Sequence, residues 1–349
     1  MVPFVDVHSH VTPFAFPDAP SAAVRGRWPC MHCSSPAEGT VMIGDAPFRK
    51  LDNRSWNVSR RIEDMDRDGV AMQVLSPMPE LLSYWLSSAD AELICDTSNR
   101  QIAEMIAAAP RRFRGLGAVT LQDPKRAARM MKNIRREFGL SGVEIGSNID
   151  GEMLGGARFD PFWAAAEEEG MAVFVHALHP LAAKPIAPSP QFTAFSLFPI
   201  DVAMAAASLL MSGVMDRFPT LRIGFSHGGG ALGAILGRLD TGWERTDGYA
   251  ANVQRRPSEQ ARALFYDSNV YDPAYLRHLA TTVVPGQVFA GTDYPYEIMQ
   301  QAPASFIHGL GLNAADLESL SIGAASRFLD EDLSSALKPG TSQHLEGQG

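Results

Sequence analysis

The sequence predicts a (β/α)8 barrel with one long insertion after its first strand. Two observations lead to this prediction. Eight short apolar segments of the kind that form buried strands recur along the chain, with helix-like stretches between them. In addition, residues that can bind a metal or move a proton follow several of these segments, at the strand ends where a barrel places its active site.

The predicted strands set the topology. They cover residues 4–7, 70–76, 115–120, 141–146, 171–176, 221–227, 263–270 and 287–293. Residues 91–109, 124–138 and 160–170 have the composition and spacing of helices. Strands that alternate with helices predict a parallel sheet, and eight such units favour a barrel over the alternative, a doubly wound open sheet.

Two long segments interrupt the alternation, and each follows a strand. Residues 11–58 form an insertion rich in Pro and Gly, and residues 178–199 contain many prolines. Because both follow the C-terminal ends of strands, we expect them to act as lids over the active site. We expect residues 1–330 to form a single barrel domain and the polar residues 331–349 to form a flexible tail.

The composition excludes several classes of protein. The 349 residues are 46% hydrophobic and carry a net charge of −9, which gives no electrostatic case for binding nucleic acid or an anionic membrane. We expect no apolar run to reach the length of a membrane span and find no leader before the first strand, so a cytoplasmic location is expected. Cys30, Cys33 and Cys95 are expected to be reduced, since one C-x-x-C pair lacks the second pair of a structural zinc site.

The stretch "DVHSH" places two histidines at alternate positions where the first strand ends. His8 and His10 therefore point to the same face, as two ligands of one metal ion would, although two loop histidines would give the same pattern. Later strands end in His176, His227 and Asp293. Three imidazoles and one carboxylate can bind an ion such as Zn²⁺, which leaves one histidine for acid–base chemistry.

Longer stretches share the pattern of a known family. They are "MIGDAPFRKL", "RRIEDMDRDGVAMQVLS", "GLGAVTLQDP", "SHGGGALGAILGRLDTGW" and "RALFYDSNV", beside the shorter motifs "DVHSH", "FVHA", "FSHGGG" and "GTDYP". In these motifs the chain resembles the amidohydrolase superfamily, and within it the aminocarboxymuconate-semialdehyde decarboxylase-like family, over residues 4–330. The loop "HALHPLAAKPIAPSP" departs from that family, which has tryptophan-bearing residues facing the substrate there.

The resemblance implies a role for each matching position. One divalent metal ion, usually zinc with manganese as the alternative, would be held by His8, His10, His176 and Asp293. His227 would be the acid–base residue, with Asp293 also counted as catalytic. Arg49 matches a substrate-binding arginine, and Arg238 matches an arginine that the family lends to the neighbouring subunit's site. A homodimer is therefore implied.

The implied reaction is the non-oxidative decarboxylation of a small carboxylated muconate semialdehyde or aromatic acid. Loss of CO₂ leaves electron density on carbon, so the site must provide an electron sink and a proton. A metal acting as Lewis acid, a histidine and two arginines that bind substrate carboxylates meet these needs. The same groups could instead hydrolyse an amide, lactone or ester, or hydrate a small anionic substrate.

The fourth strand, "SGVEIGSN", predicts a mononuclear site. No lysine occurs between Lys132 and Lys184, so this strand lacks the carboxylated lysine that bridges two metals in binuclear members of the superfamily. We expect Glu144 on this strand to be a buried carboxylate that supports the ligands or the structure, not a ligand itself.

Four other residues near the predicted site are less well defined. Asp267 and Asp272 lie in or near the seventh strand, and no motif assigns them a role. His179 is expected to be an exposed loop histidine, with substrate contact as the alternative. Lys50 follows Arg49 in a strand-like stretch, so only one of the two should point inward.

Overall fold

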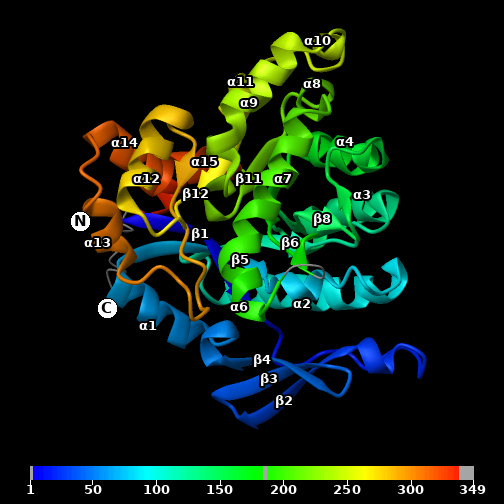
Figure 1. Ribbon diagram of the computed structural model, residues 1–349. Helices are drawn as coiled ribbons and strands as arrows, with labels where there is room; N and C mark the ends of the chain where they lie inside the picture. Colours follow the sequence, from blue (N-terminus) through cyan, green and yellow to red (C-terminus); the bar gives the residue numbers. More distant parts are fainter. Residues whose placement is uncertain (1–2, 184–186, 338–349) are drawn as a thin grey trace, which may run out of the picture.

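The computed structural model describes residues 3–183 and 187–337 and shows a barrel of eight parallel strands inside a ring of helices (Figure 1). The barrel strands are β1 (Phe4–Val11), β5 (Val70–Pro77), β6 (Phe113–Ala118), β7 (Gly142–Gly146), β10 (Ala172–His176), β11 (Arg222–Phe225), β12 (Phe265–Asp267) and β13 (Val288–Phe289). They pair in this order, each parallel to the next. The predicted (β/α)8 barrel is therefore confirmed, and the open sheet is excluded.

The barrel closes between β1 and β13 with the help of a buried carboxylate. The His10 amide donates to the Tyr294 carbonyl at 2.7 Å, which brings the end of β1 against the segment after β13. The Asp6 side chain accepts hydrogen bonds from the Thr292 hydroxyl at 2.7 Å and from the Gln73 amide at 3.0 Å. The Asp6 side chain is thus hydrogen-bonded both to β5 and to the segment after β13, at the place where the barrel closes.

The helices follow the strands as the alternation predicts. The longer ones are α1 (Val58–Asp68), α2 (Ser88–Ala108), α3 (Pro124–Asn133), α4 (Asp160–Glu168), α7 (Phe198–Leu210) and α9 (Leu232–Arg245). The shorter ones are α6 (Pro190–Phe192), α8 (Val214–Arg217), α10 (Tyr249–Asn252), α11 (Pro257–Ala261), α12 (Pro273–His278), α13 (Pro303–His308), α14 (Ala314–Glu318), α15 (Ala324–Leu329) and α16 (Leu333–Ala336). The three helices predicted from the sequence correspond to α2, α3 with the turn that extends it to Phe138, and α4.

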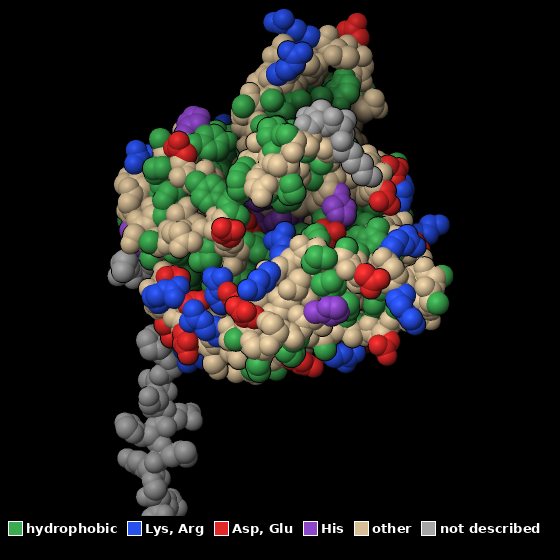
Figure 2. Space-filling view, turned by 60° about the horizontal axis from the view of Figure 1, so that its bottom comes forward, with side chains coloured by type: hydrophobic (Ala, Val, Ile, Leu, Met, Phe, Trp, Pro, Cys, Tyr) green, Lys and Arg blue, Asp and Glu red, His purple; other side chains and the backbone are tan. Residues whose placement is uncertain are grey.

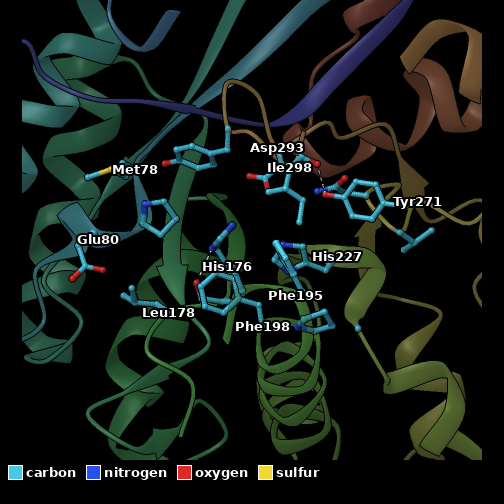
Figure 3. A pocket seen from close by; sticks show the side chains of 18 of the residues that line it. Met78, Glu80, His176, Leu178, Phe195, Phe198, His227, Tyr271, Asp293 and Ile298 are labelled. Carbon is cyan, nitrogen blue, oxygen red and sulfur yellow. Dashed lines mark hydrogen bonds between the residues drawn. The ribbon is translucent and has the colours of Figure 1, made fainter. Parts of the chain in front are cut away.

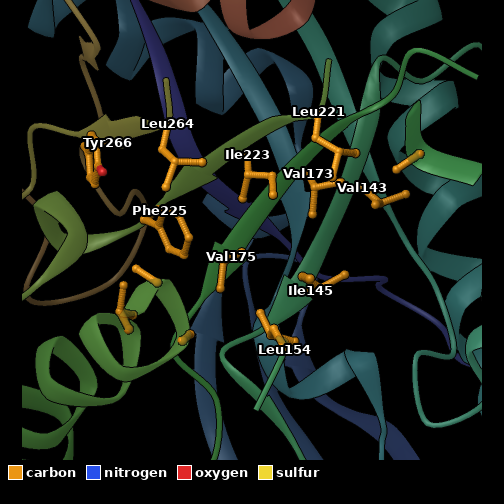
Figure 4. Close-up of a cluster of buried hydrophobic side chains, with 14 of the residues drawn as sticks. Val143, Ile145, Leu154, Val173, Val175, Leu221, Ile223, Phe225, Leu264 and Tyr266 are labelled. Atoms are coloured by element: carbon orange, nitrogen blue, oxygen red, sulfur yellow. The ribbon is translucent and has the colours of Figure 1, made fainter. Parts of the chain in front are cut away.

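Alternation along the strands divides the core into two layers. On β10, Val173 and Val175 belong to the cluster that packs under the helices, whereas Phe174 belongs to the cluster inside the barrel. Figure 4 shows the outer cluster on β7, β10 and β11. Because the side-chain period of a strand is two, the inward face that contains Phe174 also contains the last residue of β10, His176.

The insertion after β1 is more regular than its composition predicts. It contains an antiparallel sheet of β2 (Pro29–Ser35), β3 (Glu38–Ile43) and β4 (Ala46–Asp52). This sheet was not predicted beyond the strand-like stretch around Arg49 and Lys50, because its strands contain many polar and exposed residues instead of apolar runs. Gly44 lies in the turn between β3 and β4 with φ of 60°, and a Cβ there would lie 2.3 Å from the Gly26 carbonyl oxygen. Cys30, Cys33 and Cys95 are free thiols, as expected.

The second long segment also contains regular structure. One helix runs from Pro190 to Leu210. It consists of α6, a π-helical turn at Thr193–Leu197, and α7. By length and composition it could cross a membrane, which corrects the expectation that no segment would reach that length. Val202 and Leu209 on this helix are buried in the cluster under the helices, so it packs as part of the ring around the barrel.

The chain beyond residue 330 differs in part from the expected flexible tail. Leu333 on α16 is fully buried in the cluster inside the barrel, and Glu331 accepts hydrogen bonds from the Arg114 guanidinium at 2.9 Å. Residues 331–337 are ordered because Leu333 packs with Phe328 and Leu329 in the same buried cluster. Residues 338–349 lie outside the described residues.

Candidate active site

Four predicted ligands meet at the C-terminal rim of the barrel. His8 and His10 lie at the end of β1, His176 ends β10, and Asp293 follows β13. One ligand atom from each residue lies within 4.8 Å of the others, and all four side chains are buried. The structure therefore brings together residues that are as much as 285 positions apart in the sequence.

The spacing of these atoms fits a metal ion. His8 Nε2 lies 3.0 Å from His10 Nε2, and Asp293 Oδ1 lies 3.4 and 3.3 Å from these two atoms. A tetrahedral ion with bonds of about 2.0–2.1 Å holds its ligand atoms about 3.3 Å apart. His176 Nε2 and Asp293 Oδ1 are buried with no hydrogen-bond partner among the described residues, so both need another partner. The residues fit a mononuclear divalent site.

The other ring nitrogen of each histidine has an acceptor that orients it. His8 Nδ1 lies 2.5 Å from Asp267 Oδ2, while the Nδ1 atoms of His10 and His176 lie 3.0 and 2.8 Å from the carbonyl oxygens of Pro77 and Ala177. Such partners hold the proton on Nδ1 and leave Nε2 free to bind a metal. No role was assigned to Asp267 from the sequence, although it lies within the stretch "RALFYDSNV" and at the end of β12, on the same rim.

Burial sets the charge of the cluster. It lowers the pKa of His8 and of His10 to about 3 and lowers the pKa of His176 well below its ordinary value. The imidazoles are therefore neutral at neutral pH, as a metal ligand must be. Burial also raises the pKa of Glu144, whose Oε2 lies 3.7 Å from His10 Nδ1. Glu144 faces the barrel interior but is not among the four ligands.

His227 lies beside the cluster rather than in it. Its ring centre is 5.3 Å from that of His176 and 5.7 Å from that of His8. Burial lowers its pKa to about 4, so this imidazole is also neutral. Three glycines follow His227. At Gly230 the backbone passes close to Pro199, since a Cβ there would lie 1.7 Å from the Pro199 carbonyl oxygen.

A cavity of about 450 Å³ opens over these residues. Figure 2 shows the face where it opens, a hollow with histidines at its bottom and hydrophobic side chains around it. In Figure 3, His176 and His227 lie between Glu80 on one side and Tyr271 on the other. The lining includes Phe48, Arg49, Met78, Glu80, His176, Leu178, Phe195, Phe198, His227, Asn269, Tyr271, Asp293, Tyr296 and Ile298.

Arg49 reaches this cavity from the insertion. Its guanidinium lies 4.6 Å from the centre of the Tyr296 ring, and that ring stacks on His10 at 5.0 Å. The neighbouring Lys50 points away and pairs with Glu38 at 3.5 Å, as alternation along β4 requires. The insertion thus supplies a cation next to the metal ligands. Tyr296 was not predicted, although it follows Asp293 closely in "GTDYPY".

Two other predicted residues lie outside the cavity lining. Arg238 is exposed on α9, so the structure does not bring it to this chain's own cavity. His179 is an exposed loop residue whose Nε2 lies 3.0 Å from Glu80 Oε1. It is linked to the cavity wall through Glu80, whose side chain is part of the lining.

Comparisons with known proteins agree with this geometry. The sequence profile of the amidohydrolase family matches residues 5–330. The 2-amino-3-carboxymuconate-6-semialdehyde decarboxylase of Dictyostelium discoideum is 30% identical over 332 residues, which cover 94% of this chain and 92% of that protein. The crystal structure of 5-carboxyvanillate decarboxylase from Sphingomonas paucimobilis matches 95% of this chain and 100% of its own, with a TM-score of 0.75 and 25% identity. A dihydroxybenzoic acid decarboxylase from Polaromonas, solved with bound manganese and 2-nitroresorcinol, has the same fold (TM-score 0.72, 20% identity, 95% and 97% coverage).

Proposed function

The chain belongs to the amidohydrolase family, and from this membership we propose that it is a metal-dependent, non-oxidative decarboxylase of a small carboxylic acid. We propose an aromatic acid or a carboxylated muconate semialdehyde as its substrate. One arrangement carries this proposal: three imidazoles and a carboxylate converge under a cavity that a further histidine and an arginine also line. The relatives and neighbours described above are themselves named decarboxylases.

His8, His10, His176 and Asp293 would hold one divalent ion, which we propose to be zinc, with manganese as the alternative. When bound, such an ion supplies a Lewis acid that stabilises negative charge on substrate oxygen atoms. Zinc is favoured by the imidazole-rich ligand set. Manganese is supported by its presence in the Polaromonas structure.

The protein's own groups would then bind the acid and move a proton. Arg49 would bind a substrate carboxylate, because a guanidinium forms two parallel hydrogen bonds with it. The bond between the carboxyl carbon and its neighbour breaks, CO₂ leaves, and the electron pair stays on the remaining carbon. His227 takes a proton from a water molecule or a substrate hydroxyl and returns one to that carbon. The reaction therefore consumes one proton overall and needs no redox cofactor.

We propose that the protein acts as a homodimer in which Arg238 completes the partner's site. The support is that Arg238 lies on α9, next to α7, which carries an apolar exposed face. On the helix leading into and through α7, Phe195, Ile200 and Met204 expose 62%, 46% and 42% of their surface. We take these exposed apolar side chains as part of the proposed contact between subunits.

We also propose a cytoplasmic location. Three free thiols support it, since oxidising compartments favour disulfides.

Turnover of a defined panel of acids tests the proposed reaction. Protein loaded with zinc, or separately with manganese, would be given carboxymuconate semialdehydes and hydroxylated or amino-substituted aromatic acids. CO₂ release would be measured together with substrate absorbance, and the His227→Ala variant would control for decarboxylation by the metal alone. We expect one CO₂ for each substrate consumed. Substrate loss without CO₂ would assign the site to hydrolysis or hydration instead, and no turnover of any acid would contradict the proposal.

A further inference from the structure

Asn269 lies in the cavity wall with an unused hydrogen-bonding group. It follows β12 by two positions, is 1% exposed, and lines the same cavity as His227 and Asp293. Neither its amide nitrogen nor its amide oxygen has a hydrogen-bond partner among the described residues. A buried polar group without a partner costs free energy, so its presence in a binding cavity calls for an explanation by a ligand.

The backbone around Asn269 fixes where this amide lies. The Asn269 backbone N–H donates to Asp267 Oδ1 at 3.1 Å, the same carboxylate whose other oxygen orients His8. The Asp272 N–H donates to the Val270 carbonyl at 2.7 Å, and Tyr271 between them has φ of 59°. This turn holds the segment in one conformation. Asn269 is therefore presented to the cavity by the same side chain that orients a metal ligand.

The nearest polar neighbour leaves most of this amide free. The Tyr271 hydroxyl lies beside the Asn269 side chain but donates its proton to the Ile298 carbonyl at 2.8 Å. A side-chain amide offers two N–H donors and two acceptor lone pairs, and the tyrosine oxygen can take up only one of these. At least one donor and the carbonyl oxygen remain for a ligand.

The chemistry of the wall indicates what that ligand group is. Phe48, Phe195, Phe198 and Ile298 give the cavity apolar surfaces, which suit a flat ring. Arg49 lies beside Tyr296, which stacks on His10. Asn269 lies near Tyr271 and shares the Asp267 carboxylate with Gly228, the residue after His227. A group that both donates and accepts a hydrogen bond, such as a ring hydroxyl, matches the amide.

We propose that Asn269 selects the substrate by hydrogen-bonding a hydroxyl substituent of an aromatic acid whose carboxylate Arg49 binds. This inference rests on the proposed function, because it takes a carboxylic acid as the substrate. Asn269 is a specificity-determining residue: it distinguishes a hydroxylated acid from the same acid without the hydroxyl. The unhydroxylated acid would leave the buried amide unpaired, and sites of this kind reject such analogues strongly.

Ligand binding by the metal-loaded protein tests this inference independently of turnover. The probes are benzoate and 2-, 3- and 4-hydroxybenzoate, with dissociation constants measured by calorimetry. The variants are Asn269→Leu, which keeps the size but removes the amide, and Asn269→Asp, which keeps an acceptor and removes the donors. Asn133→Leu, the same change at an exposed position on α3, is the control.

We expect at least one hydroxybenzoate to bind wild-type and Asn133→Leu protein about tenfold more tightly than benzoate, a preference that Asn269→Leu abolishes. Asn269→Asp should lose part of it. A preference that survives in Asn269→Leu, or its absence from the wild type, overturns the inference. An Asn269-dependent preference without CO₂ release from any acid would instead contradict only the proposed reaction.

Discussion

The imidazole of His8 and the carboxylate of Asp267 are joined at 2.5 Å, with Nδ1 of the histidine facing Oδ2 of the aspartate and both side chains fully buried. The aspartate also accepts hydrogen bonds through Oδ1 from the Gly228 N–H at 2.7 Å and from the Asn269 N–H at 3.1 Å. One carboxylate at the end of β12 thus contacts the proposed metal ligand His8, the loop that carries His227, and the wall residue Asn269.

Replacing this carboxylate should weaken metal binding without removing any ligand. We expect Asp267→Asn to lower the metal affinity about 10- to 100-fold, because His8 loses the negative partner that fixes its proton on Nδ1. Competition with a coloured chelator measures the dissociation constant. Asp272→Asn makes the same change in an exposed residue that caps α12, and it should leave the affinity unaltered. Equal affinities in both variants and the wild type would show that Asp267 does not tune the site.

His227 should be separable from the metal ligands. We expect His227→Ala to retain a full complement of metal while kcat falls at least about a hundredfold, because the variant loses proton transfer but no ligand. Metal content is measured by elemental analysis of the protein used for kinetics. His278→Ala removes an exposed histidine on α12 and serves as the control. Loss of metal from His227→Ala would mean that His227 is itself a ligand.

The adjacent residues Arg49 and Lys50 offer a matched pair for testing substrate binding. Arg49→Met should raise KM about 10- to 100-fold, because the substrate carboxylate loses a charge-assisted, two-pronged partner. Lys50→Met removes a neighbouring cation that is 71% exposed and pairs with Glu38, so KM should change little. The measurement is steady-state kinetics at saturating metal. Equal effects of the two variants would indicate a general role of positive charge rather than a specific contact.

Asp96 on α2 should make stability depend on pH. Burial, reinforced by the nearby Glu92 carboxylate, raises the pKa of Asp96. The folded state then binds this proton more tightly than the unfolded state, so stability falls as pH rises from the unfolded pKa of about 3.9 through the higher folded value. Asp96→Asn should therefore raise the Tm at pH 7, by no more than about 2 °C in a chain of this size, and the gain should vanish near pH 4.

Thermal unfolding of the two proteins between pH 4 and 8 checks this sign. Glu104→Gln, at an exposed position on the same helix, is the control for removing one negative charge. A gain that persists unchanged at pH 4 would point to helix propensity rather than to the buried charge.

The barrel was predictable because its signals are local. Each strand is a short apolar run, and a histidine or aspartate at its end is visible in the sequence, so the strand pattern alone places His8, His10, His176 and Asp293 at one rim. The sheet of the insertion was not foreseen as a unit, since its pairing depends on short turns at residues 36–37 and 44–45 rather than on a run of apolar residues.

The residues that support the site were harder to predict than its ligands. Asp267 and Asn269 lie in the stretch "RALFYDSNV", but nothing in it shows that Asp267 contacts His8, 259 positions away, or that Asn269 lines the cavity. Tyr296 acts by stacking on His10, which spacing along the chain does not reveal. Arg238 was placed by resemblance alone, and its exposure on α9 leaves its role a prediction.

Mixing two inactive variants tests that role directly. Arg238→Ala should disable both sites of a dimer, and so should His227→Ala, because each removes one group from every site. In a mixed dimer, one of the two sites receives His227 from one subunit and Arg238 from the other and is therefore intact. Random exchange of equal amounts should restore about a quarter of the wild-type activity. Subunit exchange is verified with differently tagged chains, and the exchanged mixture is assayed for turnover. The co-purified mixed dimer, in which one of the two sites is intact, should have about half of the wild-type activity. Full exchange without any recovery would contradict a shared site and would leave Arg238 as a surface residue of its own subunit.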